Sequence, residues 1–159
     1  MFKRILVPLD GSRASAKALP YAIEIAQRFG AELILMQVVA PIAPHRVTSL
    51  SAEATKISKE AAQLQEKRQV ERGKRYLKAQ LQQITTQGVS GSYHAILGDP
   101  AKAIIRFCQK ESVDLVVMTT SGKSGIKRAL LGSVADQLVR DSTVPELVIR
   151  PEMKRKSKK

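Results

Sequence analysis

The sequence predicts a doubly wound α/β domain, in which a parallel sheet carries helices on both faces. Five short apolar runs alternate with four segments of helical character along the chain. This alternation is typical of right-handed crossovers, each of which places its helix against the sheet. Polar, glycine-containing loops follow two of the runs, as in open α/β sheets that bind ligands beyond the carboxyl ends of their strands. The 159 residues suit one domain that buries its core without metals or disulfides.

The first strand and the first helix are expected near the amino terminus. Residues 5–9 form a short apolar run that Asp10 and Gly11 end, which predicts a buried strand followed by a turn. Apolar residues then recur at helical spacing until Gly30 supplies a stop signal. Because Pro20 lies inside this segment, the helix either starts late or is kinked.

A second strand and a long helix are expected next. Residues 32–40 are apolar and rich in branched side chains, and prolines follow them. From about Ser51 to Thr85 the composition shifts to strong helix formers, with an apolar stripe near the end of the segment. The part before Glu66 lacks a clear stripe. We expect it either to project as a long, exposed helix or to be partly mobile.

The remaining elements complete the alternation. Residues 89–97 alternate between apolar and polar side chains, the pattern of an edge strand with one partly polar face. Asp99 and Pro100 predict the cap and the first residue of a third helix. Apolar runs at 114–118 and 146–149 predict the fourth and fifth strands, and the fourth helix is expected between them.

Charge and cysteine content bound the class of protein. The formal net charge is +13, but five basic residues fall within the last six positions. We therefore assign 1–151 to one domain and 152–159 to a basic, disordered tail. For this tail a solubilising role is favoured over contact with nucleic acid or an anionic surface. The single cysteine, Cys108, excludes an intrachain disulfide and indicates a reducing compartment. No run has the length of a membrane span or a signal sequence, so we expect a cytoplasmic location.

The other reactive side chains favour structural roles. Cys108 shares the apolar face of its helix with Ile104, which is typical of a small core residue rather than a nucleophile. His45 and His94 have no partners at ligand spacing, so we assign no metal site. No convincing base for nucleotide hydrolysis is present, and we assign no catalytic residue.

The loop after the fourth predicted strand has the parts of an anion site. Thr119 to Ser133 contains three glycines, at which backbone N–H groups can approach phosphate oxygens. Lys123 can supply compensating charge. Ser133 is expected to cap the fourth helix, whose amino end favours phosphate. On these residues alone, a loop whose glycines serve only turns is an equal alternative, as is a turn-forming role for Asp10.

Two enzyme classes fit the loops poorly. The run Gly122-Lys123-Ser124 resembles the end of a Walker A loop, but the first glycine of that motif would fall on Val117, inside the apolar strand. The sequence therefore argues against a P-loop NTPase. Adenylating enzymes of the PP-loop type carry S-G-G-x-D-S after the first strand, whereas this chain has Leu9-Asp10-Gly11-Ser12.

From Ile5 to Arg150 the sequence is similar to the universal stress protein family. The resemblance lies in the stretches ILVPLDGS, LMQVVAP, LGDPAKAI, VVMTTSGKSGIKRALLGSVADQLV and VPELVIRP. It implies a five-stranded flavodoxin- or Rossmann-like sheet of order 3-2-1-4-5. The ATP-binding branch of the family carries G-x2-G-x9-G-[ST], of which Gly122 and Gly132-Ser133 match, whereas Thr119 occupies the first glycine position.

The same resemblance implies ATP as the ligand, alone or with Mg²⁺. Asp10 would contact the adenine or its neighbourhood, and backbone groups at Val38 would hold the edge of the base. Pro8 and Leu9 would shape the base pocket, while the glycines and the start of the fourth helix would cradle the phosphates. The implied site comprises Pro8, Leu9, Asp10, Val38, Thr119, Gly122, Lys123, Gly132, Ser133 and Val134.

We therefore expect a regulatory, stress-response protein in which ATP acts as a conformational ligand, with at most slow hydrolysis. A dimeric interaction module of the same family that has lost its nucleotide is the alternative, and Thr119 is the residue that raises it. The last strand, Glu146 to Ile149, is expected at a sheet edge. The resemblance implies that this strand pairs with its copy in a homodimer.

Overall fold

The structure, a computed structural model, describes residues 1–42, 52–120 and 131–150. The elements along the chain are β1 (Arg4–Pro8), the short 3-10 helix η1 (Ser15–Ala18), α1 (Leu19–Phe29), β2 (Glu32–Val39), α2 (Ala52–Thr85), β3 (Gly91–Leu97), α3 (Pro100–Lys110), β4 (Leu115–Thr119), α4 (Ser133–Asp141) and β5 (Glu146–Ile149). The predicted tail at 152–159 lies outside the described residues.

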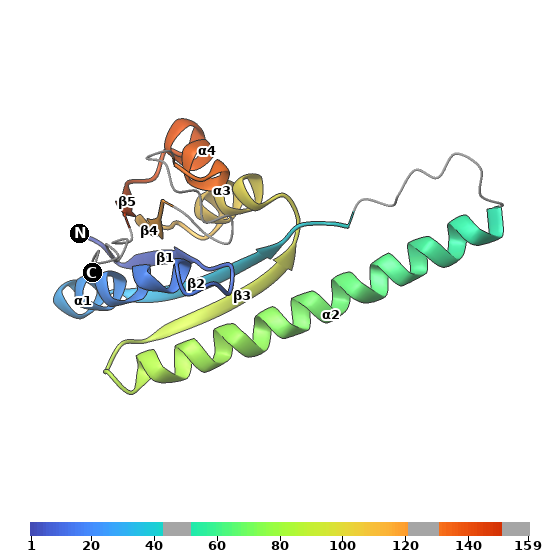
Figure 1. Cartoon of the computed structure of the whole chain (residues 1–159). Helices are drawn as coiled ribbons and strands as arrows, with labels where there is room; N and C mark the ends of the chain where they lie inside the picture. The colour runs from blue at the N-terminus through green and yellow to red at the C-terminus, as the bar shows by residue number, and fades with distance from the viewer. Residues whose placement is uncertain (43–51, 121–130, 151–159) are drawn as a thin grey trace, which may run out of the picture.

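The strands form one five-stranded parallel sheet in the order β3-β2-β1-β4-β5 (Figure 1). This order confirms the predicted doubly wound class. It also confirms that β3 and β5 lie at the two edges of the sheet. The order reverses between β1 and β4, which is the point where open α/β sheets bind their ligands.

Helices cover both faces of the sheet because alternate residues of each strand point to opposite sides. Ile5 and Val7 of β1 are fully buried with residues of α1 and α2, whereas Leu6 between them is buried with residues of α3 and α4. The two clusters are mainly aliphatic. Cys108 of α3 belongs to the second cluster, which confirms that it is a core residue, and burial is the main cause that raises the pKa of its thiol to about 11.

Local signals define the ends of α1 and the start of α3. Helix α1 begins at Leu19 with Pro20 in its first turn, so the helix starts late rather than kinking. Gly30 ends it in the left-handed conformation, with φ of 64°. The Asp99 side chain accepts a hydrogen bond from the N–H of Lys102 at 3.0 Å, which confirms the predicted cap of α3.

The predicted cap of α4 is wrong by one residue. The cap is Gly132, which has no side chain to accept a hydrogen bond. Ser133 is the first helical residue. The reason is that Gly132 has an extended backbone, with φ of −61° and ψ of 155°, and its carbonyl already accepts the N–H of Asp136 at 2.8 Å.

Helix α2 is continuous over 34 residues and differs between its two halves. Leu77 and Ile84 are buried against the sheet, with Val70 and Leu81 packed beside them, which confirms the predicted stripe. The amino-terminal half extends beyond the sheet (Figure 1). Of the two expected alternatives, the projecting helix is correct. Within the described ranges, no helix is both long and apolar enough to cross a membrane.

Candidate functional site

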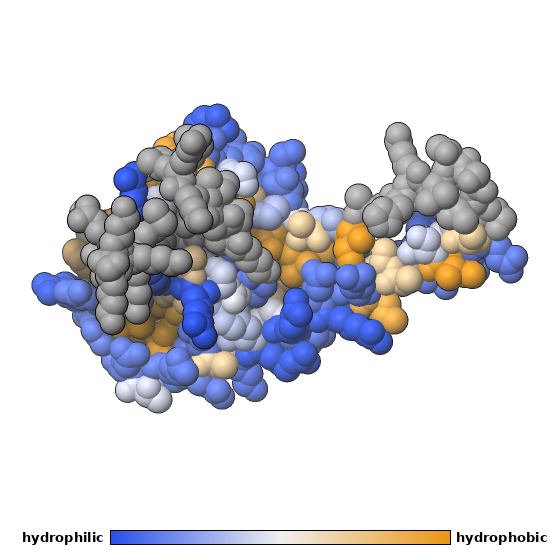
Figure 2. All heavy atoms as spheres, in the orientation of Figure 1, coloured by the Kyte–Doolittle hydropathy of each residue, from blue (hydrophilic) through white to orange (hydrophobic). Residues whose placement is uncertain are grey.

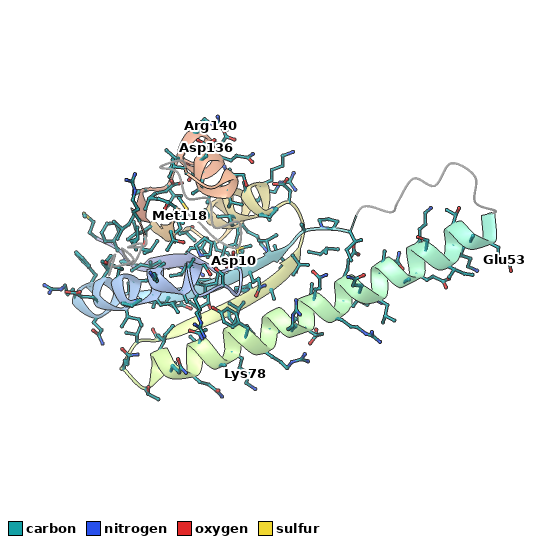
Figure 3. The ribbon with its side chains drawn as sticks, in the orientation of Figure 1. Asp10, Glu53, Lys78, Met118, Asp136 and Arg140 are labelled. Atoms are coloured by element: carbon teal, nitrogen blue, oxygen red, sulfur yellow. The ribbon has the colours of Figure 1, made fainter. Side chains whose placement is uncertain are left out.

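A cavity of about 310 Å³ opens at the carboxyl edge of the sheet, beside the ends of β1 and β4. Figure 3 labels Asp10, which follows β1, and Met118 of β4. Eight of the ten residues predicted from the sequence line this cavity: Pro8, Leu9, Asp10, Val38, Thr119, Gly132, Ser133 and Val134. Gly122 and Lys123 lie outside the described residues. Sequence reasoning therefore located the cavity from both of its sides.

The turn after β1 holds Asp10 at the cavity wall. Its Oδ1 accepts the N–H of Ser12 at 2.9 Å, and its own N–H is within 3.3 Å of the hydroxyl of Ser15. Gly11, which follows Asp10, has φ of 81°, a backbone conformation that residues other than glycine rarely adopt. Asp10 is thus a turn-forming residue and also lines the cavity, so the two roles weighed from the sequence are compatible.

Apolar side chains form much of the cavity wall. Met36 and Val38, two residues apart on β2, line it from the same face, as the alternation of a strand requires. Met118 of β4 and Ile104 of α3 add to this apolar wall and are nearly fully buried. Flexible thioethers beside aliphatic side chains suit a flat, apolar ring system such as a nucleobase.

The start of α4 also lines the cavity. The N–H groups of the first helical residues, Ser133 and Val134, have no acceptor within the helix, and the helix dipole makes this end favourable for an anion. The N–H of Gly132 is already used, because it donates to the carbonyl of Thr120 at 2.6 Å. The donors at this helix start are therefore the N–H groups of Ser133 and Val134.

The charge of Asp10 also affects Tyr76, on the other face of the sheet. Burial raises the pKa of the Tyr76 hydroxyl on α2, and the negative charge of Asp10 raises it further. Asp10 thus lines the cavity and also acts electrostatically on α2. Among the described residues, no group of three or more His, Cys, Asp and Glu side chains could hold a metal ion.

Sequence reasoning missed seven residues of the cavity wall. They are Ser15, Met36, Pro100, Ile104, Met118, Thr120 and Ala135. Met36 could have been found, because it lies two residues before Val38 and shares its face of the strand. The contribution of α3 could not, because helical periodicity identifies its apolar face without showing which residues leave a space.

Comparison with known proteins gives a consistent result. The model of the universal stress protein family matches residues 1–150. A curated relative, universal stress protein MJ0531 of Methanocaldococcus jannaschii, is 34% identical over 150 residues, which are 94% of this chain and 83% of that protein.

Solved structures share the fold. The protein MJ0577 superimposes with a TM-score of 0.81 at 24% identity, over 97% of this chain and 99% of that one. A universal stress protein in complex with cAMP matches with a TM-score of 0.58 at 21% identity, over 94% and 97% of the chains. One from Archaeoglobus fulgidus in complex with dAMP matches with a TM-score of 0.61 at 19% identity, over 93% and 98%. Fold, family model and curated relative agree: this chain belongs to the universal stress protein family.

Proposed function

We propose that this chain is a stress-response regulator that binds ATP in the cavity between β1 and β4 and uses it as a conformational ligand. The observation that carries the proposal is the make-up of the cavity wall, which combines apolar side chains such as Met36 and Met118 with the amino terminus of α4. A nucleoside fits the apolar part of the wall, and a phosphate chain fits the start of the helix. The volume of about 310 Å³ lies within the range of small-molecule sites.

The residues take separate roles in this proposal. Val38 and Leu9 shape the base pocket with the methionines, and Asp10 lies near the nucleoside. Ser133 and Val134 donate their N–H groups to the phosphates, and Gly122 and Lys123 complete the cradle. Two structural neighbours support an adenine nucleotide as the ligand, since one is described with cAMP and the other with dAMP.

Binding is tested by isothermal titration calorimetry, in which the protein is titrated separately with ATP, AMP and cAMP. In the variant Ser133→Asp, a carboxylate replaces the hydroxyl in the first turn of α4. We expect the ATP affinity to fall on the order of 100-fold, because the new charge lies beside the phosphates. An acidic residue in the first turn of a helix is favourable for folding, so the loss of affinity is not explained by unfolding.

The matched control is Ser90→Asp, which makes the same change of charge at an exposed residue before β3. It should bind ATP as the wild type does. No nucleotide binding by the wild type would decide for the nucleotide-free interaction module. Equal affinities of the two variants would instead place the phosphates away from the start of α4.

We also expect slow hydrolysis of ATP. Among the described residues of the cavity, the one candidate base is Asp10, which we assign to the nucleoside. Phosphate release is measured with ATP in the presence of Mg²⁺. Turnover at the rates of ordinary kinases, about 1–100 per second, would replace the regulatory proposal with an enzymatic one.

The second part of the proposal is a homodimer formed through β5. β4 pairs with one edge of this strand, and β5 ends the sheet. Val116 donates to the carbonyl of Pro145, and Thr120 donates to that of Ile149. Because bonding alternates along a parallel strand, the backbone groups of Glu146 and Val148 face away from β4. A strand edge of this kind can pair with its copy.

The variant Val148→Pro removes an N–H from this outer edge without removing a hydrogen bond to β4. We expect it to shift a dimer to a monomer in light scattering, with the circular dichroism of the folded protein retained. Wild-type protein that is monomeric at micromolar concentration would refute this part of the proposal and leave the nucleotide site untouched.

A further inference from the structure

The projecting half of α2 carries a surface that the core does not explain. The residues that pack α2 against the sheet, Val70, Leu77, Leu81 and Ile84, all lie in its second half. Isolated helical segments of modest length are only marginally stable in water, because most helical stability comes from packing. Within the described ranges, the part of α2 before Gln63 contributes no residue to the core, so it is a candidate for a contact with another molecule.

This half has an apolar stripe of its own. Ile57 and Leu64 expose 63% and 51% of their surface. Ala54 precedes both of them, and Ala61 lies between them. The four residues are separated by three, four and three positions, the spacing of the a and d positions of a coiled coil. Figure 2 shows apolar side chains gathered along this part of the helix.

The stripe faces away from the sheet. At the helical rotation of about 100° per residue, Ile57 and Leu64 lie roughly 140–160° around the helix from the buried Leu77. A partner that covers the stripe would therefore not collide with the sheet to which α2 belongs. We call the stripe of Ala54, Ile57, Ala61 and Leu64 the outer stripe.

We propose that the outer stripe pairs with the outer stripe of a second copy of this chain, as an antiparallel two-helix coiled coil. In such a pair each a position meets a d position. Ile57 then packs against the partner's Ala61, and Leu64 packs against the partner's Ala54. Every layer combines one large and one small side chain, so the two helices can approach closely and interdigitate.

The charges along α2 select the antiparallel orientation. The first turn of the helix contains Glu53, and its second half is rich in basic side chains: Lys67, Arg68, Arg72, Lys74, Arg75 and Lys78. A parallel pair would bring these basic segments side by side. The antiparallel pair separates them and brings Glu53 beside the partner's Lys67 at both ends of the overlap. Glu60 lies next to its own copy at the two-fold axis, and the repulsion of these two carboxylates is outweighed by the two Glu53–Lys67 contacts and by the separation of the basic segments.

The contact is small. Four layers of side chains bury less than a standard protein interface, so the pairing by itself is a weak and reversible one. It does not depend on the pairing of β5. Where both contacts form, each copy has two self-complementary surfaces, and dimers can join into larger assemblies.

Cross-linking tests which residues are neighbours. The natural Cys108 is only 3% exposed, so a cysteine introduced on α2 is the accessible thiol. With a short bismaleimide, we expect Glu60→Cys to cross-link between copies. Lys78→Cys should not, because the antiparallel arrangement holds the two copies of this position roughly 55 Å apart. Cross-linking at both positions would indicate a parallel pair, and cross-linking at neither would exclude the contact; either result overturns the proposal.

A charge swap tests the register. In the Glu60→Cys background, Glu53→Lys or Lys67→Glu alone should raise the dissociation constant roughly tenfold, because each turns two attractive contacts into repulsive ones. The double variant that combines Glu53→Lys with Lys67→Glu should restore the dissociation constant of the Glu60→Cys background. Combining Glu53→Lys with Lys78→Glu is the matched control, since it has the same net charge as the swap but should restore nothing. Equal restoration by both double variants would contradict the register.

Discussion

Near the carboxyl end of β2, the face under α3 and α4 is hollow, whereas the face under α2 is filled. A second hollow under α2 lies further out, at the end of the edge strand β3. Strand β2 has one side chain pattern on the hollow face and another on the filled face. Met36 and Val38 of β2 line the cavity, and Gln37 between them points to α2, where the Cβ missing at Gly73 would lie 3.1 Å from its Oε1. Binding and stability are thus assigned to opposite faces of the same strand. Substitutions on the two faces should therefore have separable effects.

The largest effect is expected for truncation on the filled face. Leu77 is fully buried between α2 and the sheet, so Leu77→Ala should lower the free energy of unfolding by about 3 kcal/mol. Urea unfolding measures this loss. The matched truncation Val38→Ala adjoins the existing cavity and should cost about 1 kcal/mol while weakening nucleotide binding. Equal losses of stability in the two variants would contradict the comparison.

A similar loss is expected where the filled face leaves no room for a side chain. A Cβ at Gly91, the first residue of β3, would lie 2.5 Å from the backbone oxygen of Leu33 and 2.8 Å from Cδ1 of Leu81. Gly91→Ala should therefore destabilise the protein by about 2 kcal/mol. Gly73→Ala is the control, because its looser contact is with a side chain and helix propensity favours alanine by about 1 kcal/mol. Thermal unfolding that ranks the two variants in the opposite order would refute the expectation.

A gain of stability is expected at Gln37. Its Oε1 is buried and has no hydrogen-bond partner in the described part of the chain, although it lies in the filled interface. Replacement by the apolar Gln37→Leu removes a buried acceptor and should raise the free energy of unfolding by about 1 kcal/mol. Chemical denaturation checks the sign. A loss of more than about 1 kcal/mol would mean that the amide has a partner that offsets its burial.

The smallest effect concerns Glu146 at the start of β5. Burial raises the pKa of its carboxyl above 4.5, although a hydrogen bond with Ser142 opposes the shift. The folded state therefore holds this proton more tightly than the unfolded state does. Its contribution to stability is greatest below pH 4.5 and falls as the pH rises through the folded pKa. Glu146→Gln should remove this fall and be the more stable protein at pH 7. Parallel stability curves from pH 4 to 7 for the two proteins would show that the carboxyl does not contribute.

The sequence predicted the fold well where single residues decide a local structure. Asp99 with Pro100 defined the start of α3, and Gly30 defined the end of α1, because caps depend on neighbours in sequence. The cap of α4 was misplaced because serine and glycine are both common at that position, and the backbone path into the helix decided between them.

The site was predicted less completely than the fold. The turn at Asp10 and the start of α4 were recognisable because glycines and polar residues mark them. Ile104 and Met118 look like ordinary core residues in the sequence, and both are in fact nearly buried. Whether such a side chain faces another side chain or an open space depends on how α3 and α4 lie across the sheet, which no local pattern encodes.

The hydrogen bond from Gly132 to Thr120 has a consequence for how this protein can change over generations. It joins the two ends of the segment between β4 and α4, so the length and sequence of that segment can vary without displacing the strand or the helix. A lineage could therefore exchange the intervening residues for others that suit a different ligand, while it inherits the same folded frame.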